Sequence, residues 1–355
     1  YDKSKIKGKE VFLNIDFRLK KAEPLLTAGQ VMAYAQLPVV TKQACSGDCS
    51  KMLAQGHGKK KMKLAAKKNN VVAVTTPNLT FKIDRSTGLI SEYAYNGKSL
   101  LGEGGTLKPN FWRAPTDNDM GAGLQKKFKV WKNPQMNLKN IDVKKDKKTN
   151  SVTILTSFDM PEVQGQMDIT YVVFANTGAV KVTEDFKATE GAKVSDMFRF
   201  GMLMQMPYTM EKSNYYGRGP IENYSDRKDC MRIGVYTDDA DNQYFPYIRP
   251  QESGTKSDIR WWKQTDATGL GLQVKSCTPF YASAIHFDTE ELDDGDDKEQ
   301  RHSFDLKKSK FTNLFLDSAH MGVGGENSWG AWPLEKYRVH YGNKTFTFTL
   351  IPQGK

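Results

Sequence analysis

Met-Asp-Ile-Thr-Tyr-Val-Val-Phe, at residues 167–174, carries the clearest secondary-structure signal in the chain. β-Branched and aromatic residues dominate it, and its first five residues alternate between apolar and polar side chains. Asn-Thr-Gly follows at residues 176–178, and these residue types favour a tight turn. The stretch therefore predicts a β-strand that buries one face and ends at a turn.

The same strand character recurs on both sides of this stretch. Turn residues separate the segments at short intervals, as at residues 86–88 and 96–97. Convincing helical periodicity is scarce, and the best short candidate is residues 125–131. An all-β protein follows, and its length favours a large sandwich over a small barrel. The further segments with strand character include residues 71–76, 152–155, 180–183 and 346–350.

Changes in composition divide the chain into three parts. Residues 1–40 contain two strand-like segments, 11–19 and 31–37, and a lone pair of strands is only marginally stable in water. We therefore expect this pair to complete a sheet whose other strands lie outside the chain. Residues 41–70 are rich in Lys, Gly and Ala without clear periodicity, which predicts a linker. Residues 71–355 are expected to form one continuous β domain.

The net charge of +11 on 355 residues raises the question of nucleic-acid binding. The lysines are concentrated in runs, such as residues 59–61 and 144–148, and no recognised RNA- or DNA-binding motif accompanies them. We interpret these runs as solvated loops. No apolar run approaches the roughly 18 residues that a membrane-spanning helix needs. We therefore expect neither nucleic acid nor a membrane as a partner.

The start of the chain and its cysteines bear on the cellular compartment. The chain opens on Tyr1 with no signal-like apolar stretch, and we interpret it as part of a longer polypeptide that is either cytoplasmic or periplasmic. Cys45 and Cys49 are four residues apart, and a disulfide between them would require an oxidising compartment. A zinc site with His57 is the alternative, but the fourth ligand is missing nearby.

The other two cysteines, Cys230 and Cys277, lie in apolar, strand-like surroundings. Free cysteines in such surroundings usually behave as small hydrophobic residues. We therefore predict that both are core residues.

Four motifs in the predicted β domain combine polar, aromatic and glycine residues where loops are expected. Such loops can bind sugars: aromatic faces cover the sugar ring, polar groups bind its hydroxyls, and glycines let the backbone approach closely. The alternative is that their polar residues only bond the backbone and fix turns. Because four motifs occur in one domain, we favour a functional face. In order, they are residues 110–121 (Asn-Phe-Trp-Arg-Ala-Pro-Thr-Asp-Asn-Asp-Met-Gly), 216–227 (Tyr-Gly-Arg-Gly-Pro-Ile-Glu-Asn-Tyr-Ser-Asp-Arg), 247–254 (Tyr-Ile-Arg-Pro-Gln-Glu-Ser-Gly) and 320–330 (His-Met-Gly-Val-Gly-Gly-Glu-Asn-Ser-Trp-Gly).

Taken in order, these motifs resemble the C-terminal region of the large bacterial β-galactosidases of glycoside hydrolase family 2. Residues 79–90 match that family as well, so the resemblance covers roughly residues 75–355. The first 40 residues resemble the closing strands of the family's preceding immunoglobulin-like domain. The resemblance implies a large antiparallel supersandwich similar to galactose mutarotase, preceded by a partial immunoglobulin-like strand pair.

The resemblance also implies where the chemistry lies. Family members hydrolyse terminal β-galactosides with retention, using two glutamates in an upstream barrel domain to which Mg²⁺ and Na⁺ also bind. The barrel has no counterpart in this chain, so we expect no catalytic residue, no metal site and no activity of the chain alone. Glu222, Glu252, Asp117 and Asp119 are expected to hold loops in shape. The expected partners are a galactoside, the barrel and the immunoglobulin-like domain of the same polypeptide, and the parent is compatible with a homo-oligomer.

Trp329 is the residue that we expect to contact substrate. Its neighbours are too polar and glycine-rich for an ordinary core tryptophan, and the resemblance implies that it forms part of a sugar-binding platform. Residues 117–125 are expected to be a mobile loop, because glycine lowers the cost of changing backbone conformation. The alternative is a rigid turn whose aspartates cap backbone N–H groups. The residues expected to border the active site are Asp117, Asn118, Asp119, Gly121, Gly324, Gly325, Glu326 and Ser328.

Two other functions are open at this point: a free-standing carbohydrate-binding module and an aldose epimerase. The incomplete strand pair favours a part of a larger enzyme over a free-standing module. An epimerase would need its own acid and base, and a mutarotase-like fold does not by itself provide them. A reading frame that continues upstream into a barrel with two active-site glutamates would distinguish these functions.

Overall fold

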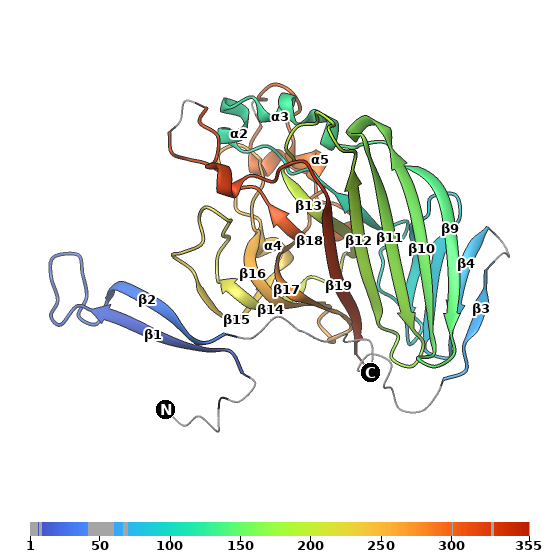
Figure 1. The fold of residues 1–355 in the computed structure, drawn as a ribbon. Coiled ribbons are helices and arrows are strands. Elements are labelled where there is room, and N and C mark those ends of the chain that lie inside the picture. The colour runs from blue at the N-terminus through green and yellow to red at the C-terminus, as the bar shows by residue number, and fades with distance from the viewer. Residues whose placement is uncertain are drawn as a thin grey trace. The chain divides into compact units, whose positions relative to one another are not determined.

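The computed structural model describes residue 6 and residues 9–41, 60–66, 70–299, 301–327 and 330–354. The chain divides into two compact units, Tyr1–Asp48 and Cys49–Lys355. Strands dominate the described part of each unit (Figure 1).

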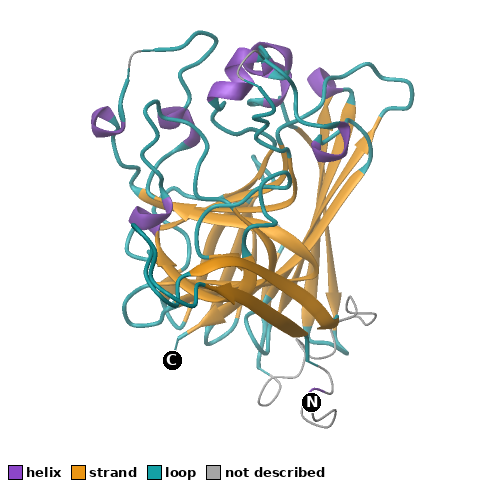
Figure 2. Cartoon of the chain, turned by 90° about the vertical axis from the view of Figure 1, so that its left-hand side faces the viewer, coloured by secondary structure: helices purple, strands orange, loops and turns teal. Residues whose placement is uncertain are grey.

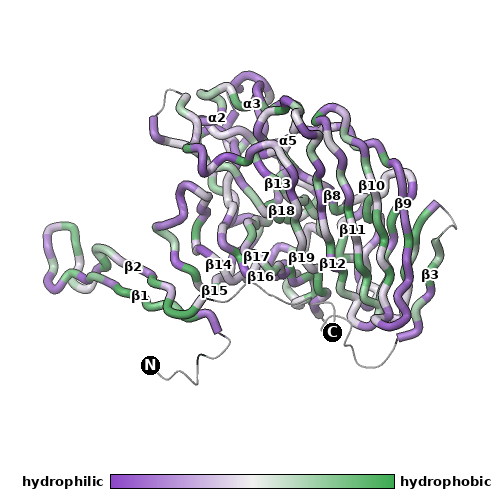
Figure 3. The backbone as a smooth tube through the Cα atoms, in the orientation of Figure 1, coloured by the Kyte–Doolittle hydropathy of each residue, from purple (hydrophilic) through white to green (hydrophobic). Residues whose placement is uncertain are grey.

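The smaller unit contains a hairpin of the antiparallel strands β1 (Val11–Arg18) and β2 (Val31–Val40). This pair confirms the two strands predicted near the start of the chain. Hydrophobic residues lie along both strands, as Figure 3 shows by colour. Several of the large ones are exposed to solvent, among them Leu13, Phe17 and Met32.

The larger unit contains two antiparallel sheets within its described residues. The larger sheet has twelve strands, nine of which follow the order β15-β14-β16-β17-β19-β12-β11-β10-β9. Strand β13 pairs with β8 and β18, and β18 joins β17. The strands of this sheet are β8 (Leu107–Asn110), β9 (Asn137–Asp146), β10 (Ser151–Met160), β11 (Gly165–Phe174), β12 (Val180–Ala188), β13 (Arg199–Pro207), β14 (Lys212–Gly219), β15 (Arg232–Asp239), β16 (Lys256–Thr265), β17 (Gly271–Ile285), β18 (Phe311–His320) and β19 (Lys344–Gln353).

The second sheet has five strands in the order β3-β4-β5-β6-β7 within the described residues. It packs on the larger sheet: the rings of Phe81 and Tyr171 lie 5.9 Å apart, and the Tyr93 hydroxyl donates a hydrogen bond to the Gly178 carbonyl (2.8 Å). The strands are β3 (Lys63–Ala65), β4 (Val71–Thr75), β5 (Leu79–Asp84), β6 (Ile90–Tyr95) and β7 (Lys98–Ser99).

Burial follows the alternation that the sequence shows. Alternate residues of β5, β10 and β11 are buried, as expected where one face of each strand meets the core. Trp262 in β16 is fully buried in this core. The all-β fold and its antiparallel sandwich are thus confirmed.

Short helices interrupt the loops of the larger unit, and Figure 2 shows most of them together with long loops beyond one end of the strands. The helix predicted near residues 125–131 is confirmed as α3 and the 3-10 turn η2. The helices are α2 (Asp117–Gly121), α3 (Leu124–Lys127), α4 (Ala240–Gln243) and α5 (Thr289–Leu292), with the 3-10 turns η2 (Lys129–Trp131), η3 (Pro161–Val163), η4 (Ser303–Asp305) and η5 (Glu335–Tyr337).

The structure differs from the expected linker at residues 41–70. Strand β3 lies inside this range and pairs with β4, with Lys63 opposite Thr75 and Ala65 opposite Ala73. The backbone of residues 63–65 thus finds partners in the sheet, and sequence periodicity cannot reveal so short an edge strand. Cys45, Cys49 and His57 lie outside the described residues.

The prediction that Cys230 and Cys277 are core residues is wrong, because both are exposed. Cys230 lies in a turn before β15. In β17, the pairing with β16 shifts between Lys275 and Phe280, so the residues around Cys277 depart from the regular ladder. Apolar neighbours in the sequence therefore did not ensure burial.

Candidate functional site

The first motif leads from β8 into the capped helix α2. The Thr116 hydroxyl accepts a hydrogen bond from the Asp119 backbone N–H (3.2 Å), and the Asp119 carboxylate accepts one from the Thr116 N–H (2.9 Å). This reciprocal capping box satisfies two N–H groups that a helix N-terminus leaves unpaired. We expected residues 117–125 to form a mobile loop; the structure has helical residues here, with Asp119 capping a backbone N–H as in the alternative, and the mobility of this stretch stays a prediction.

The Asp119 carboxylate also forms a buried ion pair with Arg113, and this arginine connects the first motif to the fourth. Arg113 donates to Asp119 from Nε (3.0 Å) and Nη2 (2.8 Å), and both side chains are almost fully buried. The guanidinium also donates to the carbonyls of Met321 (2.7 Å) and Gly322 (2.9 Å). A two-pronged pair of this kind fixes geometry as well as charge. It therefore fixes the start of α2 against the fourth motif.

Helix α2 and the fourth motif also contact each other directly. The Asn118 amide donates to the Val323 carbonyl (3.0 Å). Gly330 has a φ of +92°, and a Cβ atom at this position would lie 2.5 Å from the Gly121 carbonyl oxygen. Glycine is therefore required there both by backbone conformation and by space.

Asp226, in the second motif, anchors the fourth motif from another side. Its carboxylate accepts hydrogen bonds from the backbone N–H groups of Val323 (3.0 Å) and Gly324 (2.8 Å). A Cβ atom at Gly322 would lie 2.4 Å from an Asp226 carboxylate oxygen. The glycines of the fourth motif thus permit a close approach between backbone and carboxylate.

The third motif holds Asp117 at the start of α2. Arg249 donates to one Asp117 oxygen (3.1 Å) and the Gln251 amide donates to the other (2.9 Å), while the Asp117 N–H donates to Gln251 (3.2 Å). Partial burial opposes the shift, but the hydrogen bonds from Gln251 and Arg249 lower the pKa of Asp117. The backbone N–H of Glu252 donates to the Ala114 carbonyl (3.0 Å). All four motifs therefore meet.

Glu222 is bound to the second and third motifs. Its carboxylate accepts hydrogen bonds from the Gly254 N–H (2.8 Å), from Arg227 (2.5 Å) and from the Tyr247 hydroxyl. These bonds fit the expectation that Glu222 holds a loop in shape.

Glu252 belongs to a buried cluster of charges between β13, β18 and the third motif. Arg199 donates twice to Asp317 (3.1 and 2.6 Å) and once to Glu252 (3.5 Å), and Glu252 also accepts from the Thr255 hydroxyl (2.7 Å). Burial raises the pKa of Asp317 to about 6, although Arg199 opposes this shift. Burial, assisted by the charge of Arg199, lowers the pKa of His320 well below its usual value, so its imidazole is neutral.

Arg199 and Asp317 were not predicted as part of any site. A signal for Arg199 exists in the sequence, because it stands between Phe198 and Phe200 in a strand. A charged residue among buried aromatic residues indicates a buried partner. The identity of that partner, more than one hundred residues away, could not be derived from the pattern.

The structure brings the predicted residues of α2 together with Gly324 of the fourth motif. Gly325 has a φ of +108° in the left-handed region, and Gly325 and Glu326 are exposed. Ser328 and Trp329 lie outside the described residues. We refer to α2 together with residues 322–327 as the motif platform.

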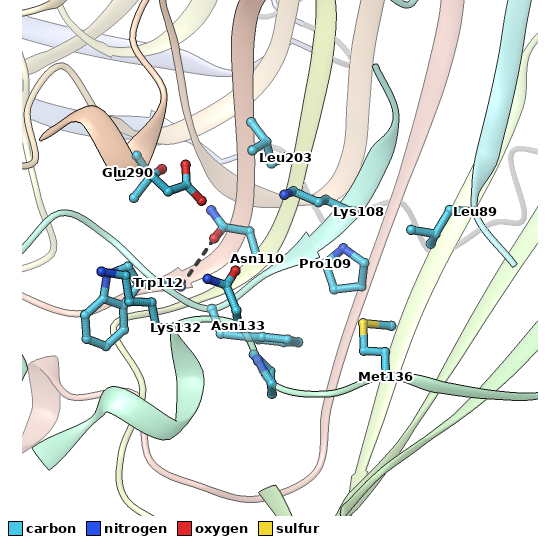
Figure 4. Close-up of a pocket in the computed structure, with 13 residues that line it drawn as sticks. Leu89, Lys108, Pro109, Asn110, Trp112, Lys132, Asn133, Met136, Leu203 and Glu290 are labelled. Atoms are coloured by element: carbon cyan, nitrogen blue, oxygen red, sulfur yellow. Dashed lines mark hydrogen bonds between the residues drawn. The ribbon is translucent and has the colours of Figure 1, made fainter. Parts of the chain in front are cut away.

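A separate hollow lies beside the start of the first motif, with a volume of about 170 Å³ (Figure 4). The Asn110 side-chain oxygen accepts from the Trp112 N–H (3.3 Å), while its amide nitrogen is buried without a hydrogen-bond partner in the described structure. Figure 4 shows Lys108 and Glu290 extending toward this amide. This hollow was not predicted from the sequence.

Neither a cluster of metal-ligating side chains nor a membrane-spanning helix occurs in the described residues. Among them, no three or more His, Cys, Asp or Glu side chains are grouped so that they could hold a metal ion. Across the same ranges, no helix is long and apolar enough to span a membrane.

Comparison with known proteins identifies the relatives of the chain. The family described as β-galactosidase small chain matches residues 75–350. A β-galactosidase of Priestia megaterium is 30% identical over 346 residues, which cover 97% of this chain and 32% of the relative. A β-galactosidase of Lactobacillus delbrueckii subsp. bulgaricus is 34% identical over 222 residues, which cover 62% of this chain and 21% of the relative. The chain spans a third or less of the length of these relatives.

Solved structures give more distant likenesses. A putative aldose 1-epimerase of Escherichia coli K12 matches with a TM-score of 0.42 and 8% identity, over 82% of this chain and 99% of that one. The galactosidase domain of an α-galactosidase-sucrose kinase matches with a TM-score of 0.42 and 11% identity, over 82% of this chain and 42% of that one. At these scores the likenesses are too distant to carry an argument.

Proposed function

The chain belongs to the β-galactosidase small-chain family, and we propose that it is the C-terminal part of a β-galactosidase that hydrolyses terminal β-D-galactosides such as lactose. In this proposal, the motif platform borders the active site and helps to bind the galactoside. The observation that carries the proposal is the meeting of all four motifs around α2 through buried and half-buried hydrogen bonds.

The geometry of the platform supports a binding role. A binding surface works best when its backbone is already fixed before the ligand arrives, because less entropy is then lost on binding. The Arg113–Asp119 pair, the Asn118 amide and the Asp226 carboxylate provide such fixation from three sides. The polar residues at the edge, such as Glu326, stay exposed and available to a ligand.

The catalytic chemistry is proposed to lie in another part of the polypeptide. A retaining glycosidase needs two carboxyl groups about 5 Å apart, one as nucleophile and one as acid and base. In this chain, Asp119, Glu222 and Glu252 are all engaged by basic residues of the same chain. Mg²⁺ and Na⁺ are proposed to accompany the catalytic carboxylates in that other part.

The hairpin β1–β2 is proposed to complete an immunoglobulin-like domain of the same polypeptide. Its exposed apolar residues, including Leu13 and Phe17, support this, because a two-stranded hairpin is marginally stable unless further strands or a helix cover it. The barrel and this domain are thus the proposed partners in the chain, and a homo-oligomeric parent is compatible with them.

Steady-state kinetics of the complete polypeptide would test the binding role. Trp329→Ala should raise KM for a nitrophenyl β-galactoside by a factor equivalent to roughly 1–3 kcal/mol, because an indole can cover a sugar ring. Asn118→Ala, which removes the bond to Val323, should raise KM less. Asn140→Ala is the control, since the Asn140 amide also donates one hydrogen bond but lies in β9, outside the motif platform. A large loss of thermal stability with unchanged KM in Trp329→Ala would refute the binding role.

A further inference from the structure

A second pocket lies in the larger unit, beside the end of β15, the helix α4 that follows it and the start of β16. Its volume is about 360 Å³, within the range of small-molecule sites. None of its lining residues belongs to the motif platform. We call it the Lys256 pocket, and it is lined by Pro220, Ile221, Glu222, Arg227, Cys230, Met231, Asp238, Asn242, Gln243, Phe245, Tyr247 and Lys256.

Buried charges of both signs line this pocket. Lys256 is 1% exposed, and its ammonium donates to Asp238 (3.1 Å), whose side chain is also buried. Glu222 accepts hydrogen bonds from Arg227 and from the Tyr247 hydroxyl. Two cations are thus matched by two anions. Buried lysines are rare in proteins, and a paired one beside an open pocket is an arrangement that needs an explanation.

The bonding capacity of Lys256 is not used up. An ammonium group has three N–H donors, and one hydrogen bond, to Asp238, is described for Lys256. Burial lowers the pKa of Lys256, while Asp238 and Glu222 oppose this shift. A buried ammonium without full hydrogen bonding is costly, so a molecule whose hydroxyl oxygens accept hydrogen bonds from the remaining N–H groups would be favoured.

The outer part of the pocket is apolar and aromatic. Phe245 is 54% exposed, and its ring lies 4.6 Å from that of Tyr247. Ile221 is exposed as well. An exposed phenyl ring beside a pocket offers a flat apolar face against which the C–H groups of a sugar ring can pack.

From these walls, we propose that the Lys256 pocket is a binding site for a neutral polyol of the size of one hexose. Lys256 and Arg227 donate to the oxygens of the sugar, Glu222 and Asp238 accept from its hydroxyls, and Phe245 covers one ring face. The balance of two positive and two negative side chains favours a neutral ligand, because an anion would meet the two carboxylates. The site is separate from the motif platform and independent of the proposed hydrolysis.

Cys230 provides a direct reporter, because it is exposed and lines the pocket. The purified 355-residue chain would be alkylated with iodoacetamide in the presence of D-galactose, and each cysteine peptide would be followed by mass spectrometry. The ligand should slow alkylation of Cys230 and leave Cys277, which is exposed but does not line the pocket, unchanged. Equal protection of both cysteines, or of neither, overturns the proposal.

Substitutions identify the walls that bind the ligand, with D-galactose titrated by calorimetry. Phe245→Ala should weaken binding about two- to ten-fold by loss of the aromatic face. Lys256→Met should weaken it about ten-fold or more, since hydrogen bonds to charged groups are the stronger ones. Phe17→Ala is the matched control, because Phe17 is 61% exposed and does not line the pocket.

Three outcomes of this titration contradict the proposal. The first is binding that Phe245→Ala leaves unchanged, which would point to the hollow of Figure 4 or to the motif platform. The second is protection of Cys230 by sodium sulfate but not by D-galactose, which would make the site one for anions. The third is the absence of any measurable binding. Because Phe245 is exposed, its variant is expected to fold even if Lys256→Met does not. Binding is measured without hydrolysis, so failure here is distinct from failure of the proposed function.

Discussion

The hairpin β1–β2 and the strands β10–β12 share one sequence pattern but bury it very differently. In β12, Phe186 is fully buried against Trp131 and Tyr341. In β1, Phe17 is 61% exposed although it is paired with Ala33 of β2. The strands of the larger unit pack against a second sheet at Tyr171 and against helical and loop residues at Phe186, whereas the described part of the smaller unit contains a single hairpin. Alternation therefore defines which face of a strand is apolar, and a second layer decides whether that face is buried.

The loop end of the larger unit differs from both the hairpin and the strands, because polar groups are buried there, each with a partner. Arg113 and Asp119 are buried as a pair, whereas Glu184 in β12 is buried with both carboxylate oxygens lacking a hydrogen-bond partner among the described residues. The following predictions compare these environments.

Phe186→Ala should lower the free energy of unfolding of the larger unit by about 3–5 kcal/mol, because it leaves a cavity in a core that is otherwise filled. Chemical denaturation followed by fluorescence would measure the change. A cost below about 1 kcal/mol would mean that the covering layer does not protect this face as described.

Asp119→Ala should cost about 3–5 kcal/mol, since it leaves Arg113 buried without its counter-charge. Asp117→Ala is the control: Asp117 is also paired, but its side chain is 54% exposed, so removing it should cost about 1 kcal/mol or less. Equal losses in the two variants would show that burial of the Arg113–Asp119 pair is not what stabilises α2.

Glu184→Leu should stabilise the protein by about 1–3 kcal/mol at neutral pH, because it removes a buried polar group without partners. Burial, and then the charge of Asp317, raises the pKa of Glu184 well above its usual value of 4.5. The folded protein therefore binds this proton more tightly than the unfolded chain. The contribution of Glu184 to folding stability is fully present below its usual pKa and is lost as the pH rises toward the raised pKa.

Denaturation of wild type and Glu184→Leu across a pH series would measure this effect. The wild type should lose stability as the pH rises above 4.5, and the variant should lose less. Asp317, whose pKa is raised to about 6, should account for the loss of stability that remains in the variant, and this loss should end above that pH. Glu190→Leu, at an exposed position, is the control. Identical pH curves for wild type and Glu184→Leu would contradict the assignment.

Phe17→Ser should change the free energy of unfolding of this chain by no more than about 0.5 kcal/mol, as is usual for exposed positions. In the complete polypeptide, the same change should be destabilising, because the proposed immunoglobulin-like domain would cover Phe17. Differential scanning calorimetry of both proteins would compare the two. A large effect in the isolated chain would remove the contrast between the hairpin and the sandwich.

The strands could be predicted from sequence because alternation and turn residues are local signals. The alternating stretch at β11 and the turn after it correspond to the observed element, as does the short helix before Trp131. The short strand β3 gave no periodic signal, and its place depends on pairing with β4. Cys277 was misplaced in the core because a local irregularity in β17 is not visible in the composition of its neighbours.

The sequence indicated which segments form the site but not which hydrogen bonds and ion pairs connect them. The glycine-rich and acidic motifs indicated which loops to consider, and Asn118 and Gly324 do lie at the contact between α2 and the fourth motif. The role of Asp119 as both helix cap and partner of Arg113 depends on residues that meet only in the folded chain. Whether Trp329 contacts a substrate remains a prediction.

The most direct test of the central claim is hydrolysis of a nitrophenyl β-galactoside by the purified 355-residue chain. We expect a rate equal to that of buffer, because the catalytic carboxylates are proposed to lie in another part of the polypeptide. Glu222→Gln and Glu252→Gln should leave this background unchanged. Release of nitrophenol by the chain that either substitution abolishes would contradict the account and place the chemistry within these residues.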